Sequence, residues 1–120
     1  MGIITNAGYD AMATYLATSF PYVANGTDPT SEEYTDTALG SENSANGSAR
    51  KTATTSTTSV GITEWDAIFY FTGDVTVREL AIVSASSGGT MLYRRVLASS
   101  RDYVDADSME VHVTHTYTRS

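Results

Sequence analysis

The clearest pattern in the chain is an alternation of apolar and polar residues close to its C-terminal end. Met109, Val111 and Val113 are each separated by one polar residue, which is the period expected of a strand with one buried face. Turn-forming residues divide the region before it into further segments of strand character. The predicted strands cover residues 52–60, 64–72, 75–84, 90–98 and 109–118.

One of these segments changes phase along its length. Val75 and Val77 alternate with polar residues, but Leu80 and Ile82 continue the apolar pattern on the other parity. A β-bulge would bring all four apolar side chains back to one face of the sheet. The sequence therefore predicts a bulge near Glu79.

A single helix is predicted near residues 6–18, ahead of the strand signals. Its apolar residues recur at helical spacing and form one modest face. The residues of this face are Tyr9, Met12, Ala13 and Leu16. Thr5 or Asn6 can cap the first turn with a side-chain oxygen. Phe20 ends the helix, because the residue before a proline avoids the helical conformation.

A long polar segment over residues 25–51 follows a short strand near residues 22–24. It contains turn signals at irregular spacing, and its few large apolar residues are chiefly Tyr34 and Leu39. Loops of this length are uncommon in compact domains and usually carry function or contact a partner. We expect Leu39 to hold the middle of the loop against the core. The rest of the loop has too little apolar content to fold over its own domain, and it could instead lie across that of a neighbouring chain.

Short strands separated by turns, with one helix at the start, predict a mostly β protein. The expected architecture is an antiparallel, jelly-roll-like β-sandwich with one short N-terminal helix. A length of 120 residues suits one domain. Because neither a repeat nor a linker divides the sequence, residues 1–120 are expected to form a single domain.

Composition narrows the possible partners. The net charge is −7, with 14 acidic and 7 basic residues, and a surface of this sign repels the phosphate backbone of nucleic acids. No apolar stretch approaches the roughly 20 residues that span a bilayer, and the first residues lack the features of a signal peptide. We therefore expect no nucleic-acid partner, no membrane association, and synthesis in a cytoplasm.

The distribution of charge also bears on the environment of the protein. Lys51 is the only lysine, while acidic residues, serine and threonine are abundant. Two interpretations are open. One is adaptation to high salt, in which carboxylates keep the surface hydrated when other electrostatic interactions are screened. The other is the mild acidity common among proteins of ordinary environments.

Two groups of residues were considered as metal ligands. His112 and His115 are three apart, and on a strand this spacing sends the side chains to opposite faces. Asp102, Asp105 and Asp107 could supply oxygen ligands to calcium, but the run lacks the glycine and the glutamate of a calcium-binding loop. The sequence predicts no metal site, and the chain has no cysteine to form one.

Catalytic motifs were considered in the same way. The sequence has no nucleophile elbow of the G-x-S-x-G type. Glu64 and Asp66 flank Trp65, and on a strand they share one face, an arrangement that could serve sugar chemistry. Such spacing is far from sufficient for hydrolysis. We expect no catalytic residues and no cofactor.

Glu79 is notable because it lies between apolar residues of a predicted strand. A buried carboxylate needs a charged or hydrogen-bonding partner. Candidate partners are Arg50, Arg94 and Arg95. In one interpretation an ion pair holds the loop that ends near Arg50 against the sheet; in the other, Glu79 points to solvent beside a bulge.

Three stretches resemble segments of small structural proteins of tailed bacteriophages and of haloarchaeal tailed viruses. Residues 4–8 resemble their opening segment, and residues 37–42 with Arg50 resemble a T-x-L-x-x-E … R stretch. Residues 77–83 and 87–94 resemble an I-x-E-x-G-L-x … G-G-x-L-x-A-R hairpin, with Ala81 where the pattern has its first glycine and Tyr93 where it has the alanine before the arginine. The order and spacing of the stretches match, and together they cover most of the chain.

The resemblance implies a structural protein of the virion, located in the head, tail, collar, fibre or baseplate. Such a protein would be made in the host cytoplasm. The expected partners are further copies, in a trimer, pentamer or hexamer, and other virion proteins. An adaptor, receptor-binding or glycan-binding module of a tail fibre or baseplate is the alternative, with aromatic residues such as Trp65 and Tyr70 contacting host glycan. The residues expected at interfaces are Tyr34, Leu39, Trp65, Phe69, Tyr70 and Phe71.

Overall fold

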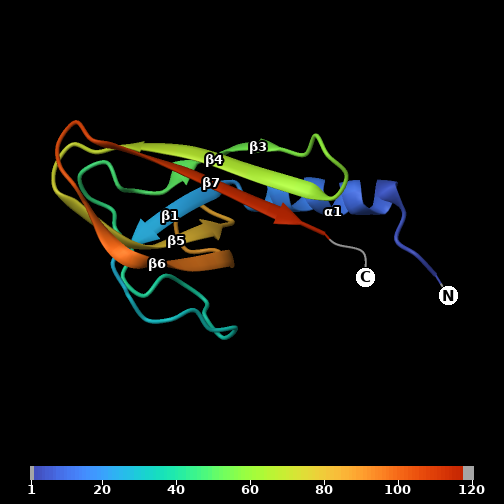
Figure 1. The fold of residues 1–120 in the computed structure, drawn as a ribbon, viewed down its shortest axis with the longest axis horizontal. Helices are drawn as coiled ribbons and strands as arrows, with labels where there is room; N and C mark the ends of the chain where they lie inside the picture. Colours follow the sequence, from blue (N-terminus) through green and yellow to red (C-terminus); the bar gives the residue numbers. More distant parts are fainter. Residues whose placement is uncertain (1, 118–120) are drawn as a thin grey trace.

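A computed structural model describes residues 2–117 of the chain. Two antiparallel sheets pack face to face, and one helix lies at the end of the sandwich (Figure 1). The elements are α1 (Asn6–Ser19), β1 (Tyr22–Gly26), β2 (Lys51–Thr52), β3 (Thr54–Ser56), β4 (Ile62–Tyr70), β5 (Val75–Val83), β6 (Met91–Tyr103) and β7 (Ser108–Thr116). The predicted fold class, mostly β with two antiparallel sheets and a short N-terminal helix, is confirmed.

The strand orders define the two layers. Sheet A has the order β2-β1-β5-β6, and sheet B has the order β3-β4-β7. Sheet A therefore has β6 at one edge, and sheet B has β7 at one edge. In Figure 1, sheet B lies above sheet A, and the first part of the long loop lies below sheet A.

The helix forms where its capping residue and apolar face predict it. The Thr5 hydroxyl accepts a hydrogen bond from the Gly8 amide at 3.1 Å. Tyr9, Ala13 and Leu16 are the buried residues of the helix. The Thr63 hydroxyl of β4 donates to the Ala13 carbonyl at 3.0 Å, which fixes the helix to the sandwich. None of the helices in residues 2–117 is long and apolar enough to cross a membrane.

The predicted strand over residues 52–60 is wrong in detail. The chain forms β2 at the edge of sheet A and then β3 at the edge of sheet B, with Ala53 between them. The Ala53 amide donates to the Pro21 carbonyl at 2.8 Å, so the chain crosses between the sheets at this residue. β6 also extends to Tyr103, beyond the predicted end at residue 98, because its polar second half pairs with the start of β5.

The inner face of β4 carries the aromatic residues of the core. Trp65, Phe69 and Phe71 share one parity with Ala67 and are all buried, whereas Ile68 and Tyr70 point outward and are exposed. The alternation is that of a strand with one buried face. The aromatic bulk of this segment is thus accommodated between the two sheets.

The predicted phase change in β5 is present, and the pairing shows its origin. Val77 pairs with Arg101 but Glu79 pairs with Val96, so the extra residues of the irregularity are in β6 rather than in β5. Before this point Val77 packs in the inter-sheet core, and after it Leu80 does so. Consequently, Glu79 turns to the opposite face of sheet A, the face that the long loop covers.

Candidate functional site

The long loop between β1 and β2 folds across its own sheet. Leu39 packs against Ala24, Ala81 and Val83 on the outer face of sheet A. The loop also forms backbone hydrogen bonds at the end of β1. One of them runs from the amide of Thr27, directly after β1, to the carbonyl of Ser41 at 2.9 Å. The expectation that Leu39 holds the middle of the loop is confirmed.

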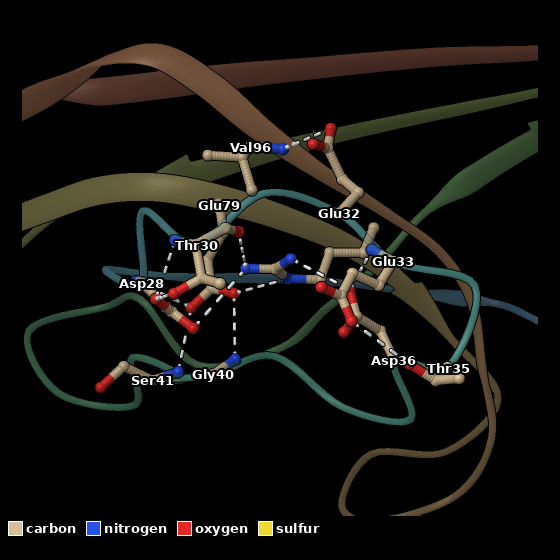
Figure 2. Close-up of polar contacts among 11 residues, drawn as sticks. Asp28, Thr30, Glu32, Glu33, Thr35, Asp36, Gly40, Ser41, Glu79 and Val96 are labelled. Atoms are coloured by element: carbon tan, nitrogen blue, oxygen red, sulfur yellow. Dashed lines mark hydrogen bonds and ion pairs between the residues drawn. The ribbon is translucent and has the colours of Figure 1, made fainter.

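Glu79 supplies the main attachment point for this loop. Its side chain is 0 % exposed, and its two carboxylate oxygens accept three backbone hydrogen bonds, each at 3.0 Å, from Asp28, Gly40 and Ser41 (Figure 2). A carboxylate that leaves water requires such donors to replace its hydration. Glu79 therefore connects the start and the middle of the loop to β5.

Arg94 of β6 completes the attachment. Its Nε atom lies 3.0 Å from Glu79 Oε1, and its terminal nitrogens bond the Asp36 carboxylate at 3.1 Å and the Thr30 carbonyl at 2.9 Å. The Asp28 carboxylate is 3.7 Å away. We refer to Glu79, Arg94, Asp28 and Asp36, with the amides that Glu79 binds, as the Glu79 cluster.

The electrostatics of the cluster favour a charged Arg94. Its side chain is only 5 % exposed, and burial by itself disfavours the guanidinium. The hydrogen bond and the charge of Glu79, followed by those of Asp36, outweigh the burial and raise the pKa of Arg94 above its ordinary value. With four hydrogen bonds on its two oxygens, Glu79 is fully used as an acceptor.

Gly26, the last residue of β1, permits the close approach of the loop. A Cβ atom at this position would lie 2.5 Å from Glu79 Oε2 and against the carbonyl oxygen of Ser41. Both atoms belong to the attachment described above, so a larger residue would push the loop away from the sheet. The absence of a side chain at Gly26 is a structural requirement of the cluster.

The structure distinguishes the three arginines that could pair with Glu79, and Arg95 is an exposed residue of β6 that pairs with Leu80. Arg94 contacts Glu79, whereas Arg50 binds Glu42 through two hydrogen bonds of 2.8 and 3.0 Å. Arg50 also donates to the carbonyls of Ala85 and Gly88, at 2.7 and 2.8 Å. The expected Glu79–Arg50 pair is therefore wrong: Arg50 lies too far along the loop and ties it to the β5–β6 turn.

Asp28 and Asp36 were missed in the sequence analysis. The sequence does contain a local signal for the first, since Asp28 precedes proline and its carboxylate accepts two hydrogen bonds from Thr30, at 3.0 and 2.8 Å. These bonds, led by the Thr30 amide, lower the pKa of Asp28. The contact between Asp36 and Arg94 joins residues far apart in sequence and has no local signal.

Beside the cluster lies a groove of about 550 Å³ between the loop and β6. Its lining residues are Glu32, Glu33, Tyr34, Asp36, Met91, Leu92, Tyr93 and Arg94. Tyr34 is fully exposed, as an interface role would require. Among the residues expected at interfaces, Tyr34 thus lines this groove.

Three other expected interface residues are core residues instead. Trp65 is 1 % exposed and its indole nitrogen donates to the Phe20 carbonyl at 2.9 Å. Phe69 and Phe71 are buried between the sheets. The interface expectation is wrong for these three, because residues of one parity on β4 all face the inner side. Trp65 is equally unable to contact a glycan, while Tyr70 remains 63 % exposed.

The long loop was also expected to have too little apolar content to fold over its own domain. The structure contradicts this expectation. Polar contacts, with Leu39 as the main apolar one, hold the loop on sheet A. Asn46 adds a further attachment by donating to the Asp74 carbonyl at 3.0 Å.

The outer face of sheet B carries a pair formed by His112 and Asp66. His112 of β7 lies opposite Asp66 of β4, and its Nδ1 contacts the Asp66 carboxylate. This hydrogen bond, with the charges of Asp66, Glu64 and Glu110, raises the pKa of His112 above its ordinary value. The His115 ring instead packs edge-on against the Tyr117 ring, with 4.7 Å between the ring centroids. The two histidines therefore do not share a site.

The acidic run near the β6–β7 turn is engaged locally. Asp102 accepts from the Thr76 hydroxyl at 2.7 Å, and Asp107 accepts from the Val104 amide at 2.8 Å. Within residues 2–117, no group of three or more histidine or acidic side chains is arranged to hold a metal ion. Asp107 thus stabilises the β6–β7 turn, and Asp102 links β6 to β5.

No protein-family model matches the chain, and no curated protein matches it either.

Proposed function

We propose that this chain is a structural subunit of a tailed virus particle, which acts through interfaces with neighbouring proteins and not through catalysis. The observation that carries the proposal is the meeting of two of the resembling stretches in one place. Residues 37–42 provide Gly40 and Ser41, and residues 77–94 provide Glu79 and Arg94. Leu39, Glu79 and Arg94, which are defined positions of the resembling patterns, thus help to hold the long loop in position.

The chemistry of the cluster supports a role in holding the loop in place. Glu79 is saturated with hydrogen bonds and out of contact with water, so it cannot exchange protons with a substrate. Arg94 is similarly enclosed. Ion pairs buried in this way mainly fix one arrangement of the chain. A loop with a fixed shape can present the same surface on every copy of a repeated subunit.

The proposed partners are further copies of the chain, in a trimer, pentamer or hexamer, and other virion proteins. Symmetric sites on a particle need a subunit with reproducible surfaces. The exposed Tyr34 on the loop and the exposed Tyr70 and Ile68 on sheet B are available for such contacts. The protein would be made in the host cytoplasm and reside in the head or tail of the virion.

Particles purified from cells that carry the gene provide the test. Quantitative mass spectrometry should find the chain in the particles at a fixed ratio to the other virion proteins, and the ratio should survive gradient centrifugation. A chain that occurs in the infected cells but is absent from the particles would overturn the proposal. As a control, a host cytoplasmic protein of similar size should be removed by the same gradient.

A further inference from the structure

The groove beside the Glu79 cluster has an open strand edge as one wall. β6 is at the edge of sheet A, and the Val96 amide points away from β5, since it donates to the Glu32 carboxylate at 3.1 Å. In an antiparallel pair, residues two apart direct their backbone groups to the same side. The amide and carbonyl of Arg94 therefore also face the groove, where an added strand could bind them.

The contact between Glu32 and Val96 marks this edge as suited to a strand. The Glu32 carboxylate occupies the place that the carbonyl of a neighbouring strand would take (Figure 2). Glu32 comes from an exposed part of the loop, so a strand that offers a better acceptor can displace it at little cost.

The charge of the groove selects the kind of occupant. The guanidinium of Arg94 pairs with Asp28, Asp36 and Glu79, and Glu32 and Glu33 also line the groove. Arg95 adds one further positive charge that acts on Glu32, so five carboxylates meet two guanidiniums. Negative charge is thus in excess at this site, and the groove attracts a cation. The exposed ring of Tyr34 offers a face on which a guanidinium or ammonium group can rest.

We propose that this groove binds a basic, extended segment of a partner protein, which adds as a strand to β6 and places an arginine or lysine side chain between Glu33 and Tyr34. The proposal deepens the proposed function, because it specifies the chemistry of a neighbour in the particle. A second copy of this chain fits less well, since the chain itself carries a net charge of −7. A metal ion is disfavoured because no suitable ligand group is formed by residues 2–117.

The test uses a blocked peptide of about seven residues, in which arginine alternates with threonine, titrated into the ¹⁵N-labelled full chain at low salt. The amide signals of residues 30–36 and 91–96 should shift, and the shifts should reach a plateau as the peptide concentration rises. Two matched peptides serve as controls. One has glutamate in place of arginine, and the other has the arginine sequence with methylated backbone nitrogens on one edge. Both should bind at least about tenfold more weakly, one through lost charge and one through lost strand pairing.

Variants of the chain connect the binding to the groove. Glu33→Gln and Tyr34→Ala, both at exposed positions, should each weaken the arginine peptide about fivefold. Asp105→Asn is the matched control at an exposed position in the β6–β7 turn and should leave the affinity unchanged. Equal binding of the acidic peptide, equal binding by all three variants, or shifts centred outside these segments would overturn the proposal.

Two further outcomes separate this inference from its alternatives. Concentration-dependent shifts of the same residues without peptide would show that a second copy occupies the groove, and this too would overturn it. Absence of peptide binding in a chain that is found in purified particles would reject the basic partner alone. Absence of the chain from particles would instead reject the structural role.

Discussion

Glu79 of β5 and Arg94 of β6 lie on neighbouring strands, with Glu79 Oε1 3.0 Å from Arg94 Nε. The long loop between β1 and β2 covers both side chains, which are almost completely buried. The pair is diagonal in the sheet, since Glu79 faces Val96 and Arg94 faces Ala81. Each residue forms its other side-chain hydrogen bonds with the loop. The pair therefore couples the sheet to the loop and not only one strand to the other.

Removal of the Glu79 carboxylate should have a large effect on stability. Glu79→Ala leaves Arg94 without its enclosed partner and leaves three loop amides without an acceptor. We expect a loss on the order of 3 kcal/mol in the free energy of unfolding. Denaturant titration measures this loss, and hydrogen exchange should show that the amides of Gly40 and Ser41 become less protected.

Two variants control this measurement. Glu79→Gln keeps the shape and one acceptor oxygen, and it should cost less than the alanine variant. Glu110→Ala removes an exposed carboxylate from β7 and should change stability by no more than about 0.5 kcal/mol. A loss below about 0.5 kcal/mol for Glu79→Ala would mean that the ion pair does not hold the loop.

Gly26→Ala tests the close approach of the loop independently of charge. The added methyl would lie 2.5 Å from Glu79 Oε2 and against the Ser41 carbonyl. We expect destabilisation of about 1–3 kcal/mol, because the loop must move or the contacts must strain. Gly2→Ala, where a Cβ meets nothing within 4 Å, is the control. Equal unfolding midpoints for the two variants would contradict the packing described here.

The sequence predicts the elements of the sandwich well because each depends on local periodicity. The helix, the phase change near Glu79 and the alternating pattern of β7 are all visible in short windows of residues. The same parity also places Trp65, Phe69 and Phe71 on one face. Their assignment to an interface is wrong because the core between the two sheets holds all three side chains, Phe69 and Phe71 in one apolar cluster and Trp65 in another.

The attachment of the loop is only partly visible in the sequence. Burial of Glu79 among apolar neighbours is a local signal, and it leads to an arginine partner. Which arginine it is depends on strand register, and Arg50 and Arg94 are distinguished only by the folded structure. The three amides that bind Glu79 leave no trace in the sequence, since every residue except proline has one.

The pair of His112 and Asp66 predicts a dependence on pH. The hydrogen bond and charge of Asp66 raise the pKa of His112 above 6.5. The pair therefore stabilises the fold below the ordinary histidine pKa, and its contribution is lost as the pH rises through the raised pKa. In NMR titrations, Asp66→Asn should lower the pKa of His112, and Glu110→Gln should lower it less. An unchanged pKa in Asp66→Asn would contradict the contact.

Salt should stabilise the protein. The net charge of −7 and the carboxylates around the groove repel one another at low ionic strength, and molar salt shortens the Debye length to about 3 Å. The enclosed pair of Glu79 and Arg94 is screened much less than exposed charges are. Thermal melts in dilute buffer and in molar salt should show a higher midpoint in salt; an equal or lower midpoint would reject adaptation to high salt.

Tyr34 and Phe69 were both expected at interfaces, but the structure places Tyr34 in solvent and Phe69 in the core. Phe69 is enclosed between the sheets, so Phe69→Ala should destabilise the isolated chain by about 3–5 kcal/mol. Tyr34 projects fully into solvent, so Tyr34→Ala should change stability by less than about 0.5 kcal/mol. Denaturant titration of both variants measures this difference.

Tyr34→Ala also decides whether the exposed loop serves assembly. If Tyr34 contacts a neighbouring chain, Tyr34→Ala should lower its incorporation into particles while the purified variant unfolds like the original protein, because exposed aromatics gain their energy only when a partner covers them. Tyr15→Ala, at an exposed position on α1 away from the loop, is the matched control. Normal incorporation of Tyr34→Ala, with loss of incorporation for Tyr15→Ala, would move the interface from the loop to the helix.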